Sequence, residues 1–290
     1  MLKYLIVSMR PKHWIKNFFV FIPLLVSGSF FNWALVKNSL FAFLSFCLVS
    51  SIVYIFNDIL DKEKDKKHQN KKYRPIAIGK ISFSTVLFFI FFLSSLIFLF
   101  QSISKNNIYV SIISYLGLNI SYSLWLKRIP IIDVLCISIG FVIRVQAGVF
   151  ATGLETSKWL ISMTFTMAMF LALGKRKVEL KNSDSHLTRE SLAGYTILAI
   201  ENMQNIFIAC TLILYLLYTE LNKTFSGNKE FLYISSVFVI TGLLRYVQLS
   251  YDDRLEDEPT NILYKDRFIL ISVFFWGLII SLSYILEPFI

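Results

Sequence analysis

Oxygen-bearing side chains recur at helical spacing near residue 60. The segment reads Asn57-Asp58-Ile59-Leu60-Asp61-Lys62-Glu63-Lys64-Asp65. Continued as a helix, it places four of them on one face, namely Asn57, Asp58, Asp61 and Asp65. Carboxylates on a shared face repel one another unless a cation lies among them, and oxygen ligands favour a hard ion such as Mg²⁺. We therefore predict a magnesium site at these four residues. The alternative is a solvated charged run beside the membrane.

A basic turn follows directly, Lys71-Lys72-Tyr73-Arg74-Pro75, and it can return toward the acidic face. A metal ion opposed by Lys and Arg side chains is a common way to hold diphosphate. Further polar residues stand where apolar stretches of the chain begin or end: Lys16, Asn17, Tyr122, Lys127, Lys175, Arg176 and Arg245. We predict that these residues line a substrate site together with Lys72 and Arg74.

One basic residue lies deep within an apolar stretch. Arg144 lies well inside the fifth predicted span, where a charge is costly and is usually either functional or paired internally. We include Arg144 in the predicted substrate site. A buried salt bridge to another polar group is the equal alternative.

The composition makes the membrane the solvent for most of this chain. Of the 290 residues, 56% are hydrophobic, 16% are aromatic and only 17% are charged, and the mean hydropathy is +0.62. Charge-free stretches, extended by a turn at the interface where they are short, predict nine membrane-spanning helices, at 17–36, 38–57, 82–104, 106–126, 134–143, 159–174, 202–219, 231–244 and 268–286. We therefore predict an all-α polytopic membrane helical bundle in which residues 1–290 form a single transmembrane domain.

The basic residues are distributed unevenly between the two sides of such a bundle. The N-terminus and the loops after even-numbered spans hold 23 of the 29 Lys and Arg residues, whereas the other loops hold 5. The positive-inside rule then places the N-terminus and the even-numbered loops in the cytoplasm and the C-terminus outside the cell membrane. The formal charge of +10 is mainly a topology signal, and we expect no nucleic-acid partner.

The acidic motif after the second of nine spans resembles that of the UbiA superfamily of intramembrane prenyltransferases. Further strings narrow the likeness to its decaprenyl-phosphate phosphoribosyltransferase branch: RPKHWIKN, YIFNDILDKEKD, KKYRPIAIG, GKRKVEL and LLRY, with EP and DR following. They extend over residues 10–267. The resemblance implies a UbiA-like fold and an enzyme that transfers 5-phosphoribose from phosphoribosyl pyrophosphate to a polyprenyl phosphate such as decaprenyl phosphate.

The resemblance also implies roles for individual residues. Asn57, Asp58, Asp61 and Asp65 would hold Mg²⁺ and the diphosphate of the donor. The phosphates would be held by Lys16, Asn17, Lys72, Arg74, Lys175 and Arg176. Asp61, Asp65 and Lys16 are the expected catalytic residues. The chain departs from the wider superfamily after span six, where Gly174-Lys175-Arg176 replaces a second aspartate-rich motif. This departure favours one metal site opposed by cations.

Two other functions remain open from the sequence. An aromatic prenyltransferase would share the fold but use a prenyl diphosphate donor, and it would need a second acidic metal site. A transporter would account for the intramembrane Arg144. The expected partners are the bilayer, a polyprenyl phosphate lipid and phosphoribosyl pyrophosphate, whereas the sequence leaves the oligomeric state open, a homo-oligomer included.

Overall fold

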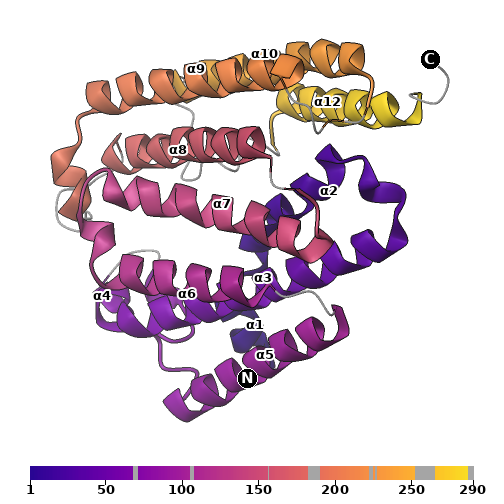
Figure 1. Cartoon of the computed structure of the whole chain (residues 1–290). Coiled ribbons are helices and arrows are strands. Elements are labelled where there is room, and N and C mark those ends of the chain that lie inside the picture. Colours follow the sequence, from indigo (N-terminus) through magenta and orange to yellow (C-terminus); the bar gives the residue numbers. More distant parts are fainter. Residues whose placement is uncertain are drawn as a thin grey trace. The chain divides into compact units, whose positions relative to one another are not determined.

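A computed structural model describes residues 1–67, 71–104, 108–155, 157–181, 190–221, 225, 227–251 and 265–286. Every regular element assigned within these ranges is a helix, which confirms the all-α prediction (Figure 1). The chain forms two compact units. Unit 1 comprises Met1–Leu24, Phe31–Trp125 and Ile143–Leu154, and unit 2 comprises Leu25–Phe30, Leu126–Val142 and Glu155–Ile290. The single domain over residues 1–290 stays a prediction.

Unit 1 is organised around the helix α3, Trp33–Leu60. At 1.5 Å per residue its 28 residues extend about 42 Å, which exceeds the roughly 30 Å of a hydrocarbon core by two turns. The side chain of Asn32 begins the helix by accepting hydrogen bonds from the amides of Ala34 and Leu35. The excess length allows the last turns of α3, with Asp58, to reach the membrane interface.

The other elements of unit 1 contact α3 directly or through one another. They are α1 (Leu2–Met9), η1 (Pro11–Phe21), α4 (Lys62–Lys67), η3 (Lys71–Tyr73), α5 (Phe83–Ser104), α6 (Tyr109–Leu124) and the second half of α7 (Ile132–Thr152). Much of α3 is buried inside the protein, whereas α5 exposes Phe88, Phe91 and Phe98. Such an exposed apolar face is what a helix presents to lipid.

The first apolar stretch does not form one straight helix, so a single continuous helix at 17–36 is not confirmed. The chain instead forms η1, a short α2 (Ile22–Val26) and η2 (Ser29–Phe31) before α3 begins. Pro23 has no backbone N–H to donate, and Gly28 adopts a positive φ of 69° that few other residues tolerate. Hydropathy alone could not reveal this break, because all of these segments are apolar.

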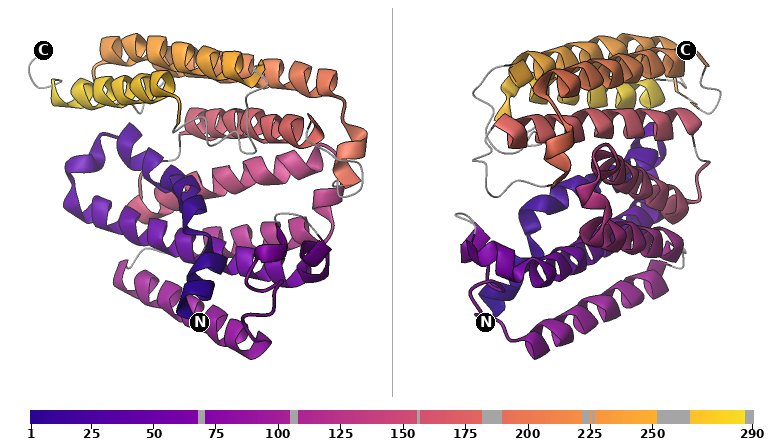
Figure 2. Two further views of the ribbon diagram at one scale, coloured as in Figure 1. Left: turned by 180° about the vertical axis from the view of Figure 1, so that it is seen from behind. Right: turned by 90° about the vertical axis from the view of Figure 1, so that its left-hand side faces the viewer.

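Unit 2 consists of helices that run beside one another (Figure 2). They are η4 (Leu126–Arg128), the first half of α7, α8 (Lys158–Lys181), η5 (Glu190–Gly194), α9 (Ile197–Leu221), α10 (Lys229–Tyr251) and α12 (Arg267–Ile285). Helix α8 packs along α9, and α10 packs along both α9 and α12. The short η4 and η5 contact each other next to the start of α7.

Within the described residues, six helices are long and apolar enough to cross a membrane, and the chain is a multi-pass membrane protein. They are α3, α5, α7, α9, α10 and α12. Helix α6 has only 16 residues, and the last turns of α8 carry several charges. Together with the broken first stretch, these two helices explain why nine spans are not confirmed.

Replacing Gly148 by Ala should destabilise unit 1, because a methyl group there would lie 2.0 Å from the carbonyl oxygen of Val20. A backbone atom cannot give way without shifting η1, so we expect a loss of about 1–3 kcal/mol in the free energy of unfolding. Thermal unfolding of purified protein in detergent would measure it. At Gly117 in α6, an added methyl group would have no neighbouring atom within 4 Å. Gly117→Ala should therefore leave the midpoint temperature of unfolding unchanged or raise it. Equal midpoints for the two variants would contradict the close approach of α7 to η1.

Candidate active site

The acidic segment spans the end of α3 and the start of α4. Asp61 separates the two helices, yet its amide donates to the Asn57 carbonyl at 2.9 Å, and the amide of Asp65 donates to the Asp61 carbonyl at 2.8 Å. These are helical hydrogen bonds between residues four apart. The helical spacing expected from the sequence is therefore kept across the break.

Two of the predicted acids meet at one guanidinium group. The Nη1 atom of Arg74 donates to Asp58 Oδ1 at 3.0 Å and to Asp65 Oδ2 at 2.6 Å. The carboxylate side chains are only 3% and 5% exposed, whereas that of Arg74 is 26% exposed. The basic turn after α4 does return to the acidic face, and its arginine is the more exposed partner in both ion pairs.

A second arginine reaches the same carboxylate from the N-terminal segment. Nη2 of Arg10 donates to Asp58 Oδ1, and the Arg10 guanidinium lies 5.0 Å from the centre of the Tyr54 ring. Arg10 joins α1 to η1 with a left-handed backbone, φ 53°. The preceding residue is held to α3, since the Ser51 hydroxyl donates to the Met9 carbonyl at 3.1 Å. Residues seven apart share a helix face, so this anchor places Arg10 beside Asp58.

Asn57 uses its side-chain oxygen in another way. It accepts a hydrogen bond from the Ser123 hydroxyl, which joins the end of α6 to the end of α3. Tyr122, a predicted substrate residue, precedes Ser123 and is partly exposed. The contact brings the end of α6 to the acidic site within unit 1.

The acidic site fits a magnesium ion by its donor chemistry. Among the residues that the structure describes, no three His, Cys, Asp or Glu side chains are close enough to hold a metal by themselves. Asp58 and Asp65 nevertheless direct one oxygen each at a single cationic nitrogen of Arg74. Magnesium is usually bound by one or two carboxylates and completes its shell with water and substrate phosphates. Two converging carboxylates meet that need, and the four-residue ligand set stays a prediction.

Arg144 makes internal contacts in unit 1. It is 5% exposed, and it donates through Nε to Asn17 Oδ1 and through Nη2 to the Tyr115 hydroxyl, both at 2.8 Å. Asn17 is fully buried and also donates to the Ser50 hydroxyl at 3.3 Å. The buried charge is thus hydrogen-bonded to neutral side chains inside unit 1. The salt bridge and the role in a substrate site both stay predictions. The amide of Asn17 is engaged in the same contacts.

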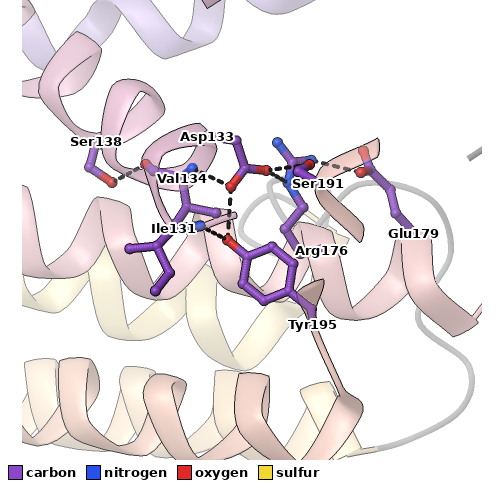
Figure 3. A network of polar contacts seen from close by, with 8 residues as sticks. All are labelled: Ile131, Asp133, Val134, Ser138, Arg176, Glu179, Ser191 and Tyr195. Atoms are coloured by element: carbon purple, nitrogen blue, oxygen red, sulfur yellow. Dashed lines mark hydrogen bonds and ion pairs between the residues drawn. The ribbon is translucent and has the colours of Figure 1, made fainter. Parts of the chain in front are cut away.

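Unit 2 contains a buried network that we did not predict from the sequence (Figure 3). Asp133 and Arg176 are both fully buried, and Arg176 Nε lies 2.5 Å from Asp133 Oδ2. Arg176 Nη1 also donates to Glu179 Oε2 at 2.7 Å. The Ser191 hydroxyl adds a hydrogen bond to Asp133 at 3.2 Å. Carboxylates therefore neutralise the Arg176 guanidinium, which gives it a structural role beyond the predicted phosphate contact.

Tyr195 completes this network through its hydroxyl group. The hydroxyl donates to Asp133 Oδ1 at 2.8 Å and accepts from the amide of Ile131 at 2.6 Å. Burial raises the pKa of the Tyr195 phenol, so this donor stays protonated at neutral pH. Ile131 has a φ of 67°, which is rare for a β-branched residue, and the hydrogen bond to Tyr195 compensates part of its strain.

A signal for this network was present in the sequence. Asp133 is the lone acid between Arg128 and Arg144, and an acid beside an apolar helix requires a partner just as Arg144 does. Arg10 offered a weaker signal, because it reads as one more basic residue before the first apolar stretch. Its link to Asp58 joins residues 48 positions apart and depends on the turn between α1 and η1.

The remaining predicted residues lie in several places. Lys16, Lys127 and Lys175 are partly exposed, and Lys72 is exposed. Arg245 donates to Asp266 Oδ2 at 3.0 Å from Nη2, and this hydrogen bond lowers the pKa of the Asp266 carboxyl. Asp266 in turn caps α12 by accepting from the Ile269 amide. The structure thus brings Asp58, Asp65 and Arg74 together in unit 1, whereas a shared site with the basic residues of unit 2 stays a prediction.

Comparison with known proteins identifies the family. The UbiA prenyltransferase family matches residues 18–283. The chain belongs to this family. Several relatives are named decaprenyl-phosphate phosphoribosyltransferase. The one from Corynebacterium glutamicum is 26% identical, over 98% of this chain and 87% of its own length, and the one from Mycolicibacterium smegmatis is 28% identical, over 94% and 89%.

Solved structures show the same UbiA fold. A UbiA homolog from Archaeoglobus fulgidus, bound to GPP and Mg²⁺, aligns with a TM-score of 0.72 at 19% identity, covering 96% of this chain and 99% of its own. This likeness confirms the UbiA-like arrangement implied by the acidic motif. The multi-pass membrane character of the chain agrees with membership of a family of intramembrane transferases.

Removing the charge of Asp133 should destabilise unit 2 strongly, since Arg176 would remain buried with one carboxylate fewer. We expect Asp133→Asn to lower the free energy of unfolding by about 3–5 kcal/mol, the range for breaking a buried ion pair. Thermal unfolding in detergent is the measurement. Arg128→Gln is the matched control in unit 2, because its pair with Glu190 is long, 3.9 Å, and exposed. The free energy of unfolding of that variant should fall by no more than about 1 kcal/mol. Equal losses in both variants would contradict the special role of the buried pair.

Proposed function

We propose that this UbiA-family chain transfers 5-phosphoribose from phosphoribosyl pyrophosphate to a polyprenyl phosphate such as decaprenyl phosphate. The products are polyprenyl-phosphoryl-5-phosphoribose and diphosphate. Support comes from full-length relatives that bear the name of this activity. The single observation that carries the proposal is the paired arrangement of Asp58 and Asp65 with Arg10 and Arg74 at the end of a membrane-spanning helix. That arrangement offers carboxylates for a metal and guanidinium groups for a diphosphate.

The donor would bind at the rim of α3 through a metal and through basic side chains. Asp58 and Asp65, with Asn57 and Asp61, would hold Mg²⁺. When bound, the ion would draw negative charge from the departing diphosphate. Lys16, Lys72, Arg74 and Lys175 would bind phosphate oxygens by charge-assisted hydrogen bonds. In this proposal Asp61, Asp65 and Lys16 belong to the catalytic group, while Arg176 supports the end of α8 through Asp133.

The chemistry is a substitution at the ribose C1 atom. A phosphate oxygen of the lipid forms the new bond to C1, and the bond from C1 to the diphosphate oxygen breaks, leaving its electron pair on the diphosphate. A phosphate monoester is already ionised at neutral pH, so no strong protein base is required. The main task of the protein is to hold two anions near each other, and cationic side chains lower that repulsion. The lipid acceptor would present its phosphate from the bilayer at the same interface.

A second candidate is an aromatic prenyltransferase that uses a prenyl diphosphate. The fold relative bound to GPP and Mg²⁺ favours it. The segment at the end of α8 argues against it, because Gly174-Lys175-Arg176 contains no acid where a second acidic metal site would be needed. The transporter alternative is not supported by the family match, and Arg144, which suggested it, donates to Asn17 and Tyr115 inside unit 1.

Purified protein with polyprenyl phosphate, phosphoribosyl pyrophosphate and Mg²⁺ should form a phosphoribosylated lipid, detected by mass spectrometry. Asp61→Ala should abolish Mg²⁺-dependent turnover and keep the protein folded, since Asp61 lies at the interface end of α3. Glu63→Ala is the matched control, because this exposed acid in the same segment pairs with Lys66. It should retain activity. Turnover of geranylgeranyl diphosphate with an aromatic acceptor, and none of phosphoribosyl pyrophosphate, would instead establish the second candidate.

We also propose nine membrane crossings with a cytoplasmic N-terminus and active site, on the basis of the uneven Lys and Arg distribution. Single cysteines at Lys64 and Lys229, both exposed, would test it in a variant whose three native cysteines are replaced by Ala. In intact cells, a membrane-impermeant maleimide should label Lys229→Cys and leave Lys64→Cys unlabelled until the membrane is opened. Labelling of both positions from the same side would disprove this topology.

A further inference from the structure

The two carboxylates of the candidate metal site are already bound to cations of the protein. Asp58 Oδ1 accepts from both Arg10 and Arg74, and Asp65 Oδ2 accepts from Arg74 at 2.6 Å. The carboxylates are almost fully buried, while the arginine side chains keep 24% and 26% of their surface exposed. Two acids are thus matched by two guanidinium groups, which lie toward the solvent.

This arrangement creates a competition at Asp58 and Asp65. A divalent ion requires direct bonds to carboxylate oxygens, and a guanidinium group at hydrogen-bond distance from the same oxygens occupies the place of such an ion. Both cations would also repel a metal ion entering between the acids. The metal can therefore bind Asp58 Oδ1 and Asp65 Oδ2 only if Arg74, and at Asp58 also Arg10, moves away from these oxygens.

The geometry points to a cation exchange: Arg74 and Arg10 are the resident counter-ions of Asp58 and Asp65, and they leave these carboxylates for the diphosphate when the divalent metal binds. The inference deepens the proposed function, on whose metal and diphosphate it rests. A guanidinium group suits both partners, because its planar fork of N–H donors matches carboxylate and phosphate oxygens equally well. The divalent ion replaces the two guanidinium charges at the carboxylates, and the diphosphate anion receives the released guanidinium groups.

Each arginine has the freedom that this exchange requires. Arg74 follows the short η3 in a turn, and its side chain is partly exposed. Arg10 lies between α1 and η1, with its guanidinium 5.0 Å from the Tyr54 ring, a contact that can hold the group near the site after Asp58 is released. Neither guanidinium has to cross the apolar interior of unit 1 to reach a phosphate at the interface.

The exchange predicts a thermodynamic link between metal and diphosphate. Metal alone must break the arginine ion pairs without compensation, so it should bind weakly. Diphosphate provides the released guanidinium groups with new partners, so each ligand should increase the affinity of the other. Coupling between two ligands commonly amounts to about 5–150-fold. Removing the Arg74 charge should tighten binding of metal alone and should reduce the coupling.

The experiment measures Mn²⁺ binding to the purified full chain in detergent by equilibrium dialysis, with and without inorganic pyrophosphate. Compartments without protein correct for complexes formed in solution. Wild-type protein should bind Mn²⁺ about 5–150-fold more tightly when pyrophosphate is present. Arg74→Gln should bind Mn²⁺ alone more tightly than wild type and gain less from pyrophosphate. Arg128→Gln, which removes an exposed arginine of unit 2, should behave as wild type.

Weaker or unchanged binding of Mn²⁺ alone by folded Arg74→Gln would overturn the exchange. If that variant does not fold, Arg10→Gln takes its place, and it should also bind Mn²⁺ alone more tightly than wild type. A wild-type Mn²⁺ affinity that is independent of pyrophosphate would likewise overturn the exchange. The readout separates this inference from the proposed function. Coupled binding of Mn²⁺ and pyrophosphate without a phosphoribosylated product would support the exchange and reject the proposed function. Product formation without coupled binding would support the proposed function and reject the exchange.

Discussion

Charge placed beside or within an apolar helical bundle must be neutralised there, and both units are arranged around this requirement. A carboxylate removed from water costs several kcal/mol unless cations and hydrogen-bond donors replace its hydration. In unit 1, Arg10 and Arg74 perform this role for Asp58. In unit 2, Arg176, Ser191 and Tyr195 perform it for Asp133. The residue after α1, the basic turn and η5 each provide a group that meets a buried acid.

The two acids differ in a way that bears on function. Asp133 is surrounded by donors on both of its oxygens, and its partner Arg176 is fully buried, so nothing can exchange without breaking the packing of α7 against α8. Asp58 is almost as deeply buried, but its cationic partners are partly exposed. A closed network stabilises the fold, whereas an acid whose counter-ions face solvent can take another cation. The exposure of the partners, more than that of the acids, separates a structural site from a binding site.

Much of this site could be predicted from the sequence, because it depends on local geometry. The spacing of Asp58, Asp61 and Asp65 fixes their shared face for any helical continuation, and the nearby basic turn brings Arg74 within reach after a short connection. Arg10 could not be predicted in the same way, since its position depends on the contact of Met9 with Ser51. The burial of Arg176 could not be predicted from the sequence either. A Lys-Arg-Lys run after an apolar helix looks like a solvated interface until the lone Asp133 is considered as its partner.

Prediction of the helices from the sequence fails in a similar way at one place, and that place affects the chemistry of the site. Hydropathy located α3, α5, α7, α9, α10 and α12, yet it could not detect the break at Pro23 and Gly28, because a turn made of apolar residues has the composition of a helix. That break matters, since it lets the N-terminal segment lie along α3 with Arg10 at Asp58 instead of crossing as one rod. It also lets Asn17 hold Arg144. Residues that contribute cations to an acidic helix end must come from segments that turn there. The irregular elements of unit 1 therefore determine which ligand the carboxylates can bind, more than its long helices do.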